Sequence, residues 1–238
     1  MKYKIIMLSI FVVSLIIFSS VKADNSLYGK CIYLDPGHGG VDPGAYYGGI
    51  KEEDINLAIA LKLKGELEDV GATVYLTRDG DYDLSNNAVD RKKNDLYKRV
   101  KLINNSGCDM YLSLHLNATK STSWHGAQVF YDDINDNNVK LASILQKQFK
   151  SDLRTNRRYK EITNGYIYRR VKIPGVLVEM GFLSNPYERE KLKTENYQYL
   201  IARSLTKGIK NYFKKYWKVV VKMVKYYYKV WWNYERGI

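Results

Sequence analysis

Hydrophobic residues recur along the chain in two alternating patterns, namely short β-rich runs and longer runs with a helical spacing. The clearest helical run holds Ile55, Ile59, Leu63 and Leu67, which lie four positions apart. Side chains with this spacing fall on one face of a helix, so the pattern predicts an amphipathic helix over residues 52–69. Short apolar runs bounded by polar residues and glycines flank it and are typical of buried strands.

The same two patterns predict the other elements of the chain. Predicted strands cover residues 30–34, 72–77, 109–116, 127–131, 165–168 and 175–179. Predicted helices after the first cover residues 94–105, 137–152, 188–192 and 197–212. Because strands and helices alternate, we expect an α/β fold: a single domain over residues 30–213, with a mostly parallel twisted sheet flanked by helices on both faces. Ligands of such sheets bind beyond the carboxyl ends of the strands.

The first 23 residues do not belong to this pattern. Lys2 and Lys4 precede an apolar run of 14 residues, and residues 21–23 offer a small-residue cleavage pattern. This is the layout of a secretory signal peptide, and a helix of that length, about 21 Å, is short for a bilayer core of about 30 Å. We therefore expect residues 1–23 to be a signal peptide, with a retained N-terminal anchor as the alternative. In both cases the remainder is exported.

The other end of the chain is strongly basic. From residue 207 onward, nine basic residues stand against Glu235 alone, within a net charge of +13 for the whole chain. Lysines in the tail, residues 214–238, recur every three or four positions between aromatic residues. This predicts a basic amphipathic helix in contact with a membrane surface, although packing on the body or on a partner is an alternative. The positive charge suits an anionic wall polymer, and we expect no nucleic-acid partner because no such module is recognisable.

Cys31 and Cys108 are the two cysteines of the chain, too few for a disulfide framework. Each begins an apolar run, so we expect two buried thiols that pack as small apolar groups. A bridge between them is the less favoured alternative for an exported protein.

Two of the three histidines, His38 and His115, stand at the carboxyl ends of predicted strands. If these strands are parallel, both imidazoles emerge at the same edge of the sheet. Glu52 begins the helix that follows the first strand, so it starts near that edge. Two imidazoles and one carboxylate with an open fourth position form the ligand pattern of catalytic zinc. Structural histidines remain the alternative from the residues alone.

Three further residues bear on this hypothesis. Glu53 competes with Glu52, and only one can face the site because adjacent helical residues point about 100° apart. His125 precedes a glycine in a predicted loop and is expected to be at the surface or to face the substrate. Glu179 ends an apolar strand, where burial would raise the pKa of its carboxyl group toward the range useful for proton transfer. A carboxylate that caps a loop or pairs with an arginine is the alternative for Glu179.

Four stretches of the sequence carry a more specific signal when they are taken together. They are LDPGHGG at 34–40, EEDINL at 52–57, SLHLNA at 113–118 and VLVEMGFLSN at 176–185. In this order they resemble the Amidase_3 family of zinc-dependent N-acetylmuramoyl-L-alanine amidases. The resemblance covers residues 30–213, nearly the whole chain after the predicted signal peptide.

The resemblance implies a zinc site and a catalytic acid at defined positions. His38, Glu52 and His115 match the residues that bind one zinc ion in the family. Glu179 matches its catalytic glutamate, which would take a proton from water and return it to the amine of L-alanine. Alignment of the acidic run favours Glu52 over Glu53 as the ligand.

The resemblance also implies weaker assignments and a biological setting. Arg99 matches a recurrent family arginine with a structural or substrate-side role, and Asn117 is a second substrate-side residue. Within the family the chain is similar to sporulation amidases, which implies action on spore cortex peptidoglycan ahead of muramic-δ-lactam formation, in the cell wall or the spore intermembrane space. Some members need an activator protein. The alternatives are an exported zinc exopeptidase and a non-catalytic wall-binding module.

Overall fold

The structure, a computed structural model, describes residues 24–85 and 89–214. The predicted signal peptide and the predicted tail beyond residue 214 lie outside these ranges, so both assignments, and membrane contact through the tail, stay predictions. Within the described ranges, no helix combines the length and the apolar character that crossing a membrane requires.

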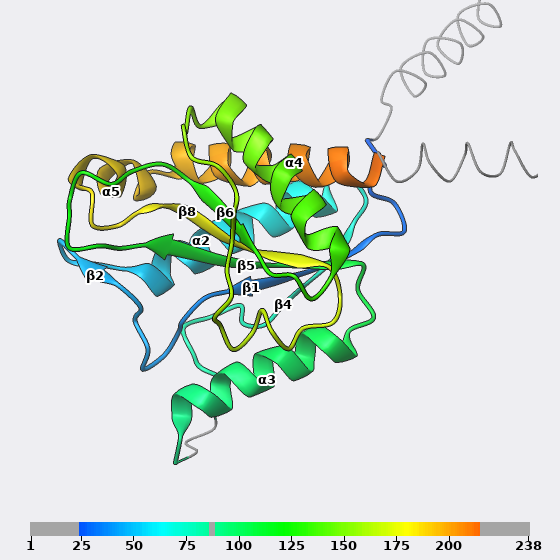
Figure 1. Ribbon diagram of the computed structural model, residues 1–238, viewed down its shortest axis with the longest axis horizontal. Helices are drawn as coiled ribbons and strands as arrows, with labels where there is room; N and C mark the ends of the chain where they lie inside the picture. The colour runs from blue at the N-terminus through cyan, green and yellow to red at the C-terminus, as the bar shows by residue number, and fades with distance from the viewer. Residues whose placement is uncertain (1–23, 86–88, 215–238) are drawn as a thin grey trace, which may run out of the picture.

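A six-stranded sheet forms the centre of the fold (Figure 1). In spatial order its strands are β4 (Thr73–Leu76), β1 (Cys31–Pro36), β5 (Met110–Asn117), β8 (Gly175–Phe182), β6 (Gln128–Tyr131) and β7 (Lys160–Glu161). The four strands from β4 to β8 are mutually parallel, whereas β6 runs antiparallel to β8 and parallel to β7. The predicted α/β fold with a mostly parallel sheet is confirmed. A short hairpin of β2 (Tyr46–Tyr47) and β3 (Ile50–Lys51) stands apart from it.

Helices cover the two faces of the sheet unequally. They are α2 (Glu52–Glu68), α3 (Arg91–Asn105), α4 (Asp136–Asp152), α5 (Pro186–Leu192) and a last helix over residues 195–214. Figure 1 shows α2, α4, α5 and the last helix on one side of the sheet, with α3 on the other. The larger apolar core lies under the four helices, and a smaller one lies between the sheet and α3. Part of the α3 side therefore has no helix over it.

The first long helix, α2, is placed by its apolar spacing. Ile55, Ile59, Leu63 and Leu67 are all buried, as their four-residue spacing predicts. Their common face contacts β1, β4 and β5. Because α2 follows the loop after β1, its first residue, Glu52, lies at the carboxyl edge of the sheet. This packing fixes the place where a functional carboxylate enters the site.

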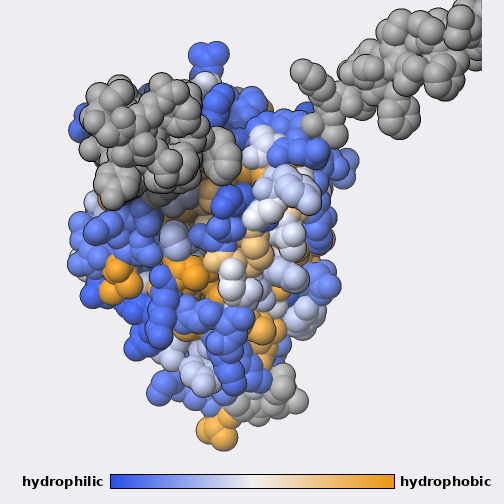
Figure 2. Space-filling view, turned by 90° about the vertical axis from the view of Figure 1, so that its right-hand side faces the viewer, coloured by the Kyte–Doolittle hydropathy of each residue, from blue (hydrophilic) through white to orange (hydrophobic). Residues whose placement is uncertain are grey.

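The prediction of two free thiols is wrong, since Cys31 and Cys108 form a disulfide. The two residues enter β1 and β5, which are neighbours in the sheet, and their Cα atoms lie 4.6 Å apart. That separation is within the range in which cysteines can be bridged. The bridge lies at the amino ends of β1 and β5. Figure 2 views the molecule from the end of the sheet at which these strands begin, and a mostly polar surface surrounds exposed apolar residues there.

The predicted strand over residues 165–168 is also wrong. This segment belongs to a turn in which the backbone N–H of Val171 donates to the carbonyl of Ile167. Strand β8, which follows, already pairs with β5 and β6, so no free edge is available there for another strand. The apolar residues Ile167 and Val171 pack instead in the smaller core beside α3.

Candidate metal centre

The loop after β1 brings His38 to the carboxyl edge of the sheet, next to His115 of β5. The backbone of His38 has φ of +64°, an uncommon region for a residue other than glycine. Gly37 passes so close over the His115 ring that a Cβ atom there would lie 2.2 Å from Cε1. A Cβ atom on Gly44 would likewise lie 2.6 Å from Oε2 of Glu52. The two glycines allow the loop to fold down onto the site.

Three of the side chains predicted from the sequence meet at this edge. Oε1 of Glu52 lies 3.2 Å from Nε2 of His38 and 3.0 Å from Nδ1 of His115. The three potential ligand atoms lie within 4.8 Å of one another, and the two imidazole rings meet edge to face. Two imidazole nitrogens and one carboxylate oxygen at this spacing form a donor set that fits a catalytic zinc ion.

The backbone fixes the Glu52 carboxylate from both sides. Oε2 accepts a hydrogen bond from the Ala45 N–H at 2.9 Å, and Oε1 accepts one from the Leu116 N–H at 3.0 Å. Burial alone would raise the pKa of Glu52, but the hydrogen bonds and charges of His115 and His38 hold it well below its usual range. Glu52 is therefore anionic, as a metal ligand must be.

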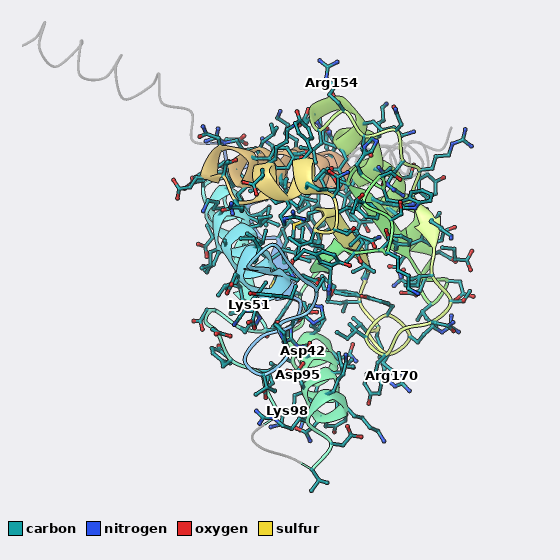
Figure 3. The ribbon with its side chains drawn as sticks, turned by 90° about the vertical axis from the view of Figure 1, so that its left-hand side faces the viewer. Asp42, Lys51, Asp95, Lys98, Arg154 and Arg170 are labelled. Carbon is teal, nitrogen blue, oxygen red and sulfur yellow. A yellow bond between two sulfur atoms is a disulfide. The ribbon has the colours of Figure 1, made fainter. Side chains whose placement is uncertain are left out.

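His38 is oriented by a residue that the sequence analysis missed. Oδ2 of Asp42 lies 3.1 Å from Nδ1 of His38, which leaves Nε2 to face Glu52. A carboxylate on the far nitrogen of a metal-binding histidine fixes its ring and tautomer. The available signal was the aspartate four residues after His38 in the same glycine-rich loop. Figure 3 views this edge of the molecule and labels Asp42.

Glu179 lies beside this cluster. It is the cross-strand partner of His115 in the parallel pair of β5 and β8. Its Oε2 is buried and has no hydrogen-bond partner among the residues described. Burial raises the pKa of Glu179 to about 7, against the opposing effect of the nearby His115. The carboxyl group can thus hold or release a proton near neutral pH.

The remaining candidates lie outside the cluster. Glu53 is buried, is not a member of the cluster and pairs with Lys51 at 2.9 Å. His125 is exposed in a loop. Asn117 ends β5, and its backbone carbonyl accepts a hydrogen bond from the Leu183 N–H at 2.8 Å. A substrate-side role for Asn117 stays a prediction.

Arg99 supports the loop after β1, which carries His38, from within the protein. Its side chain is 1% exposed and binds the carboxylates of Asp35 and Asp95 at 2.8 and 2.7 Å. The same guanidinium donates to the backbone carbonyls of Pro36 and His38 at 2.8 and 2.6 Å. These contacts give Arg99 a positioning role for the backbone that carries His38.

A second buried arginine, Arg78, binds the same loop and was not singled out from the sequence. It donates to the carbonyls of Pro36 and Gly37 at 3.1 and 3.0 Å, and also to the carbonyl of Glu53 at 2.9 Å. Arg78 therefore ties the loop after β1 to the first turn of α2. The sequence offers no periodic signal for such a residue, because it follows β4 in a loop.

We expect Arg99→Ala to lower the free energy of unfolding by about 3–5 kcal/mol, because it leaves Asp35 charged and unpaired in the interior. Arg203→Ala is the matched control, since it removes an ion pair with Glu66 in which the arginine side chain is 62% exposed. That variant should lose at most about 1 kcal/mol. Urea denaturation measures both values, and an equal loss in the two variants would contradict the positioning role of Arg99.

The chain resembles known proteins in sequence and in fold. The family described as Amidase_3, N-acetylmuramoyl-L-alanine amidase, matches residues 32–211. The germination-specific N-acetylmuramoyl-L-alanine amidase of Bacillus subtilis (strain 168) is 44% identical over 192 residues, which cover 79% of this chain and 81% of that protein.

Solved structures agree with these matches. The CwlD amidase from Clostridioides difficile, solved in complex with the GerS lipoprotein, is 38% identical with a TM-score of 0.75, over 78% of this chain and 99% of that one. The catalytic domain of CwlV, an amidase from Bacillus (Paenibacillus) polymyxa, is 29% identical with a TM-score of 0.69, over 78% and 98%. The chain therefore belongs to the Amidase_3 family and is a cell-wall N-acetylmuramoyl-L-alanine amidase.

Proposed function

We propose that the chain uses zinc to hydrolyse the amide between the lactyl group of N-acetylmuramic acid and L-alanine of the peptidoglycan stem peptide. The observation that carries the proposal is the cluster of His38, Glu52 and His115, whose ligand atoms lie within 4.8 Å of one another. These three residues would hold the ion. When bound, zinc supplies Lewis-acid polarisation of the scissile carbonyl and lowers the pKa of water.

In this proposal, Glu52 and Glu179 have different roles in the reaction. Glu52 stays anionic because two backbone N–H groups and two imidazoles surround it. Glu179 receives no such donors at its buried Oε2, so it can accept a proton from the attacking water. It then delivers that proton to the nitrogen of L-alanine as the amide bond breaks, which lets the amine leave in a neutral form.

We expect Glu179→Gln to keep zinc binding but to lower the rate of amide cleavage by about 100-fold or more, because glutamine cannot carry the proton. Metal analysis of the purified full-length chain measures the first property. Mass spectrometry of peptides released from intact sacculi measures the second, and each released peptide should begin with L-alanine.

Two variants serve as controls for this experiment. His115→Ala should lose both zinc and cleavage, whereas His125→Ala should keep both because His125 lies outside the cluster. Full activity of the Glu179→Gln variant would remove Glu179 from the proton-transfer role. Cleavage of free peptides without release from sacculi would favour an exopeptidase instead.

We further propose that the substrate is spore cortex peptidoglycan, outside the cytoplasmic membrane in the spore intermembrane space, and that cleavage is the first step toward muramic-δ-lactam. The support is the 44% identity with a germination-specific amidase. Spores that carry only the Glu179→Gln form should lack muramic-δ-lactam, as measured by mass spectrometry of digested cortex. An unchanged lactam content would place the enzyme elsewhere in the wall.

We also propose that the chain works with an activating protein partner. The support is that the similar CwlD amidase was solved together with a lipoprotein. A lipoprotein of that kind from the same cell should tighten zinc binding by the full-length chain, which isothermal titration with and without the lipoprotein would measure. Identical zinc affinity and identical activity in the two titrations would contradict an activator role.

A further inference from the structure

Arg157 is held in one orientation in the segment that leads from α4 to β7. Its Nε donates to the backbone carbonyl of His125 at 2.7 Å, and its Nη1 donates to Oε1 of Gln128 at 3.1 Å. These two bonds use two of the three guanidinium nitrogens. Its Nη2 has no hydrogen-bond partner within residues 24–85 and 89–214.

Two aromatic rings enclose the same guanidinium. Its central carbon lies 4.4 Å from the centroid of the Phe182 ring and 5.1 Å from that of the Trp124 ring. Cations at such distances are attracted by the ring quadrupole, so the rings add to the two hydrogen bonds in fixing the charge. Trp124 is 53% exposed, which leaves the Arg157 site open to the surface.

Contacts of the neighbouring residues also fix the position of the Arg157 backbone. Oγ1 of Thr155 donates to the carbonyl of Ala127 at 3.0 Å and accepts from the Arg157 N–H at 3.2 Å. Gly126 has φ of +95°, and a Cβ atom there would lie 2.6 Å from Oγ1 of Thr155. The glycine therefore lets the loop before β6 pack directly on the segment that carries Arg157.

Arg157 lies one side chain away from the proposed catalytic glutamate. Gln128, its hydrogen-bond partner, is the cross-strand partner of Glu179 in the antiparallel pair of β6 and β8. Cross-strand partners point to the same face of a sheet, with Cβ atoms about 5 Å apart. Phe182, on which Arg157 stacks, is the last residue of the same strand as Glu179. The charge thus lies beside the site, on the α3 side of the sheet.

Within the described ranges, Arg157 forms no direct ion pair with a carboxylate. The acidic group that acts on Arg157 electrostatically is Glu188. Both oxygens of Glu188 already accept backbone N–H groups, from Gly126 at 2.9 Å and from Phe182 at 2.8 Å. Arg99, by contrast, binds two carboxylates directly. A half-buried cation that is held in place, and whose nearby carboxylate is already bound to backbone N–H groups, is suited to bind an anionic ligand.

We propose that Arg157 is a specificity-determining residue that binds a free carboxylate of the stem peptide, on the L-alanine side of the scissile bond. This inference rests on the proposed amidase function of the neighbouring site. On the sugar side, the lactyl carboxyl group is consumed in the amide itself. On the peptide side, a γ-linked D-glutamate after L-alanine leaves its α-carboxylate free, and a planar guanidinium matches the geometry of a carboxylate.

The test compares two synthetic substrates that differ in one group. The first is N-acetylmuramoyl-L-alanyl-γ-D-glutamyl-L-lysine, and the second carries a carboxamide in place of the α-carboxylate of D-glutamate. The zinc-loaded full-length chain should cleave the carboxylate form with a kcat/KM about tenfold higher, because a charge-assisted hydrogen bond is lost in the amide. Equal kcat/KM values in the wild-type chain would overturn the proposal without any variant.

Arg157→Gln should abolish the discrimination by lowering kcat/KM for the carboxylate substrate alone. Arg158→Gln is the matched control, because Arg158 is exposed and touches Gln128 only through its backbone carbonyl. The Arg158→Gln variant should show the same ratio of kcat/KM between the carboxylate and the carboxamide substrate as the wild type. A wild-type preference that survives in Arg157→Gln would assign the carboxylate to another residue.

Isothermal titration calorimetry with the two free tripeptides measures how the same α-carboxylate affects binding, without any turnover. The wild type should bind L-alanyl-γ-D-glutamyl-L-lysine about tenfold more tightly than its amidated form, and Arg157→Gln should bind the two equally. Selective binding without cleavage would contradict the amidase function alone. Cleavage with equal binding of both tripeptides would contradict the role of Arg157 alone.

Discussion

The buried ion pair between Arg99 and Asp35 is the interaction on which the geometry of the candidate metal centre depends. Asp35 near the end of β1 also accepts hydrogen bonds from Thr77, which follows β4, at 2.7 Å and from Ser113 of β5 at 2.9 Å, so one carboxylate links three neighbouring parts of the sheet. Burying two charges is costly unless both are paired and hydrogen-bonded, as they are here. Because the same guanidinium binds the carbonyl of His38, the backbone of the first imidazole can take only one position.

The contacts of Arg99 offset the free-energy cost of an uncommon backbone conformation in the loop that carries His38. His38 has a positive φ, and Gly37 lies almost against the ring of His115. Uncommon backbone conformations cost about 1–3 kcal/mol each and persist where the surroundings determine them. The carbonyls of the loop are bound by Arg78 and Arg99 from beneath, which supplies that constraint. The loop is thus positioned before any ligand arrives, as a preorganised site requires.

The sequence predicted the features that depend on local pattern. The spacing of Ile59 and Leu63 marked α2, and the strand ends marked His38 and His115. Features that depend on which strands are neighbours were not predicted, as the disulfide illustrates, because each cysteine was considered within its own apolar run. Asp42, Arg78 and Arg157 share this difficulty, since each acts through a contact with a distant or irregular segment that no periodicity encodes. Glu52 could be separated from Glu53 only by a family motif or by the fold.

Two carboxylates at one sheet edge differ in how readily they take up a proton, because their surroundings differ. Glu52 accepts two backbone N–H groups and lies between two imidazoles, so its charged form is favoured. Glu179 has a buried oxygen without a donor, so burial favours its protonated form, and its pKa rises to about 7. When the surroundings of two acids separate their pKa values, one acid can act as a charged ligand and the other can transfer a proton. Arg157 is a third charged group whose surroundings define its role: it is fixed by two hydrogen bonds and forms no direct ion pair within the described ranges, which supports the proposal that it binds an anionic group next to the bond being cut.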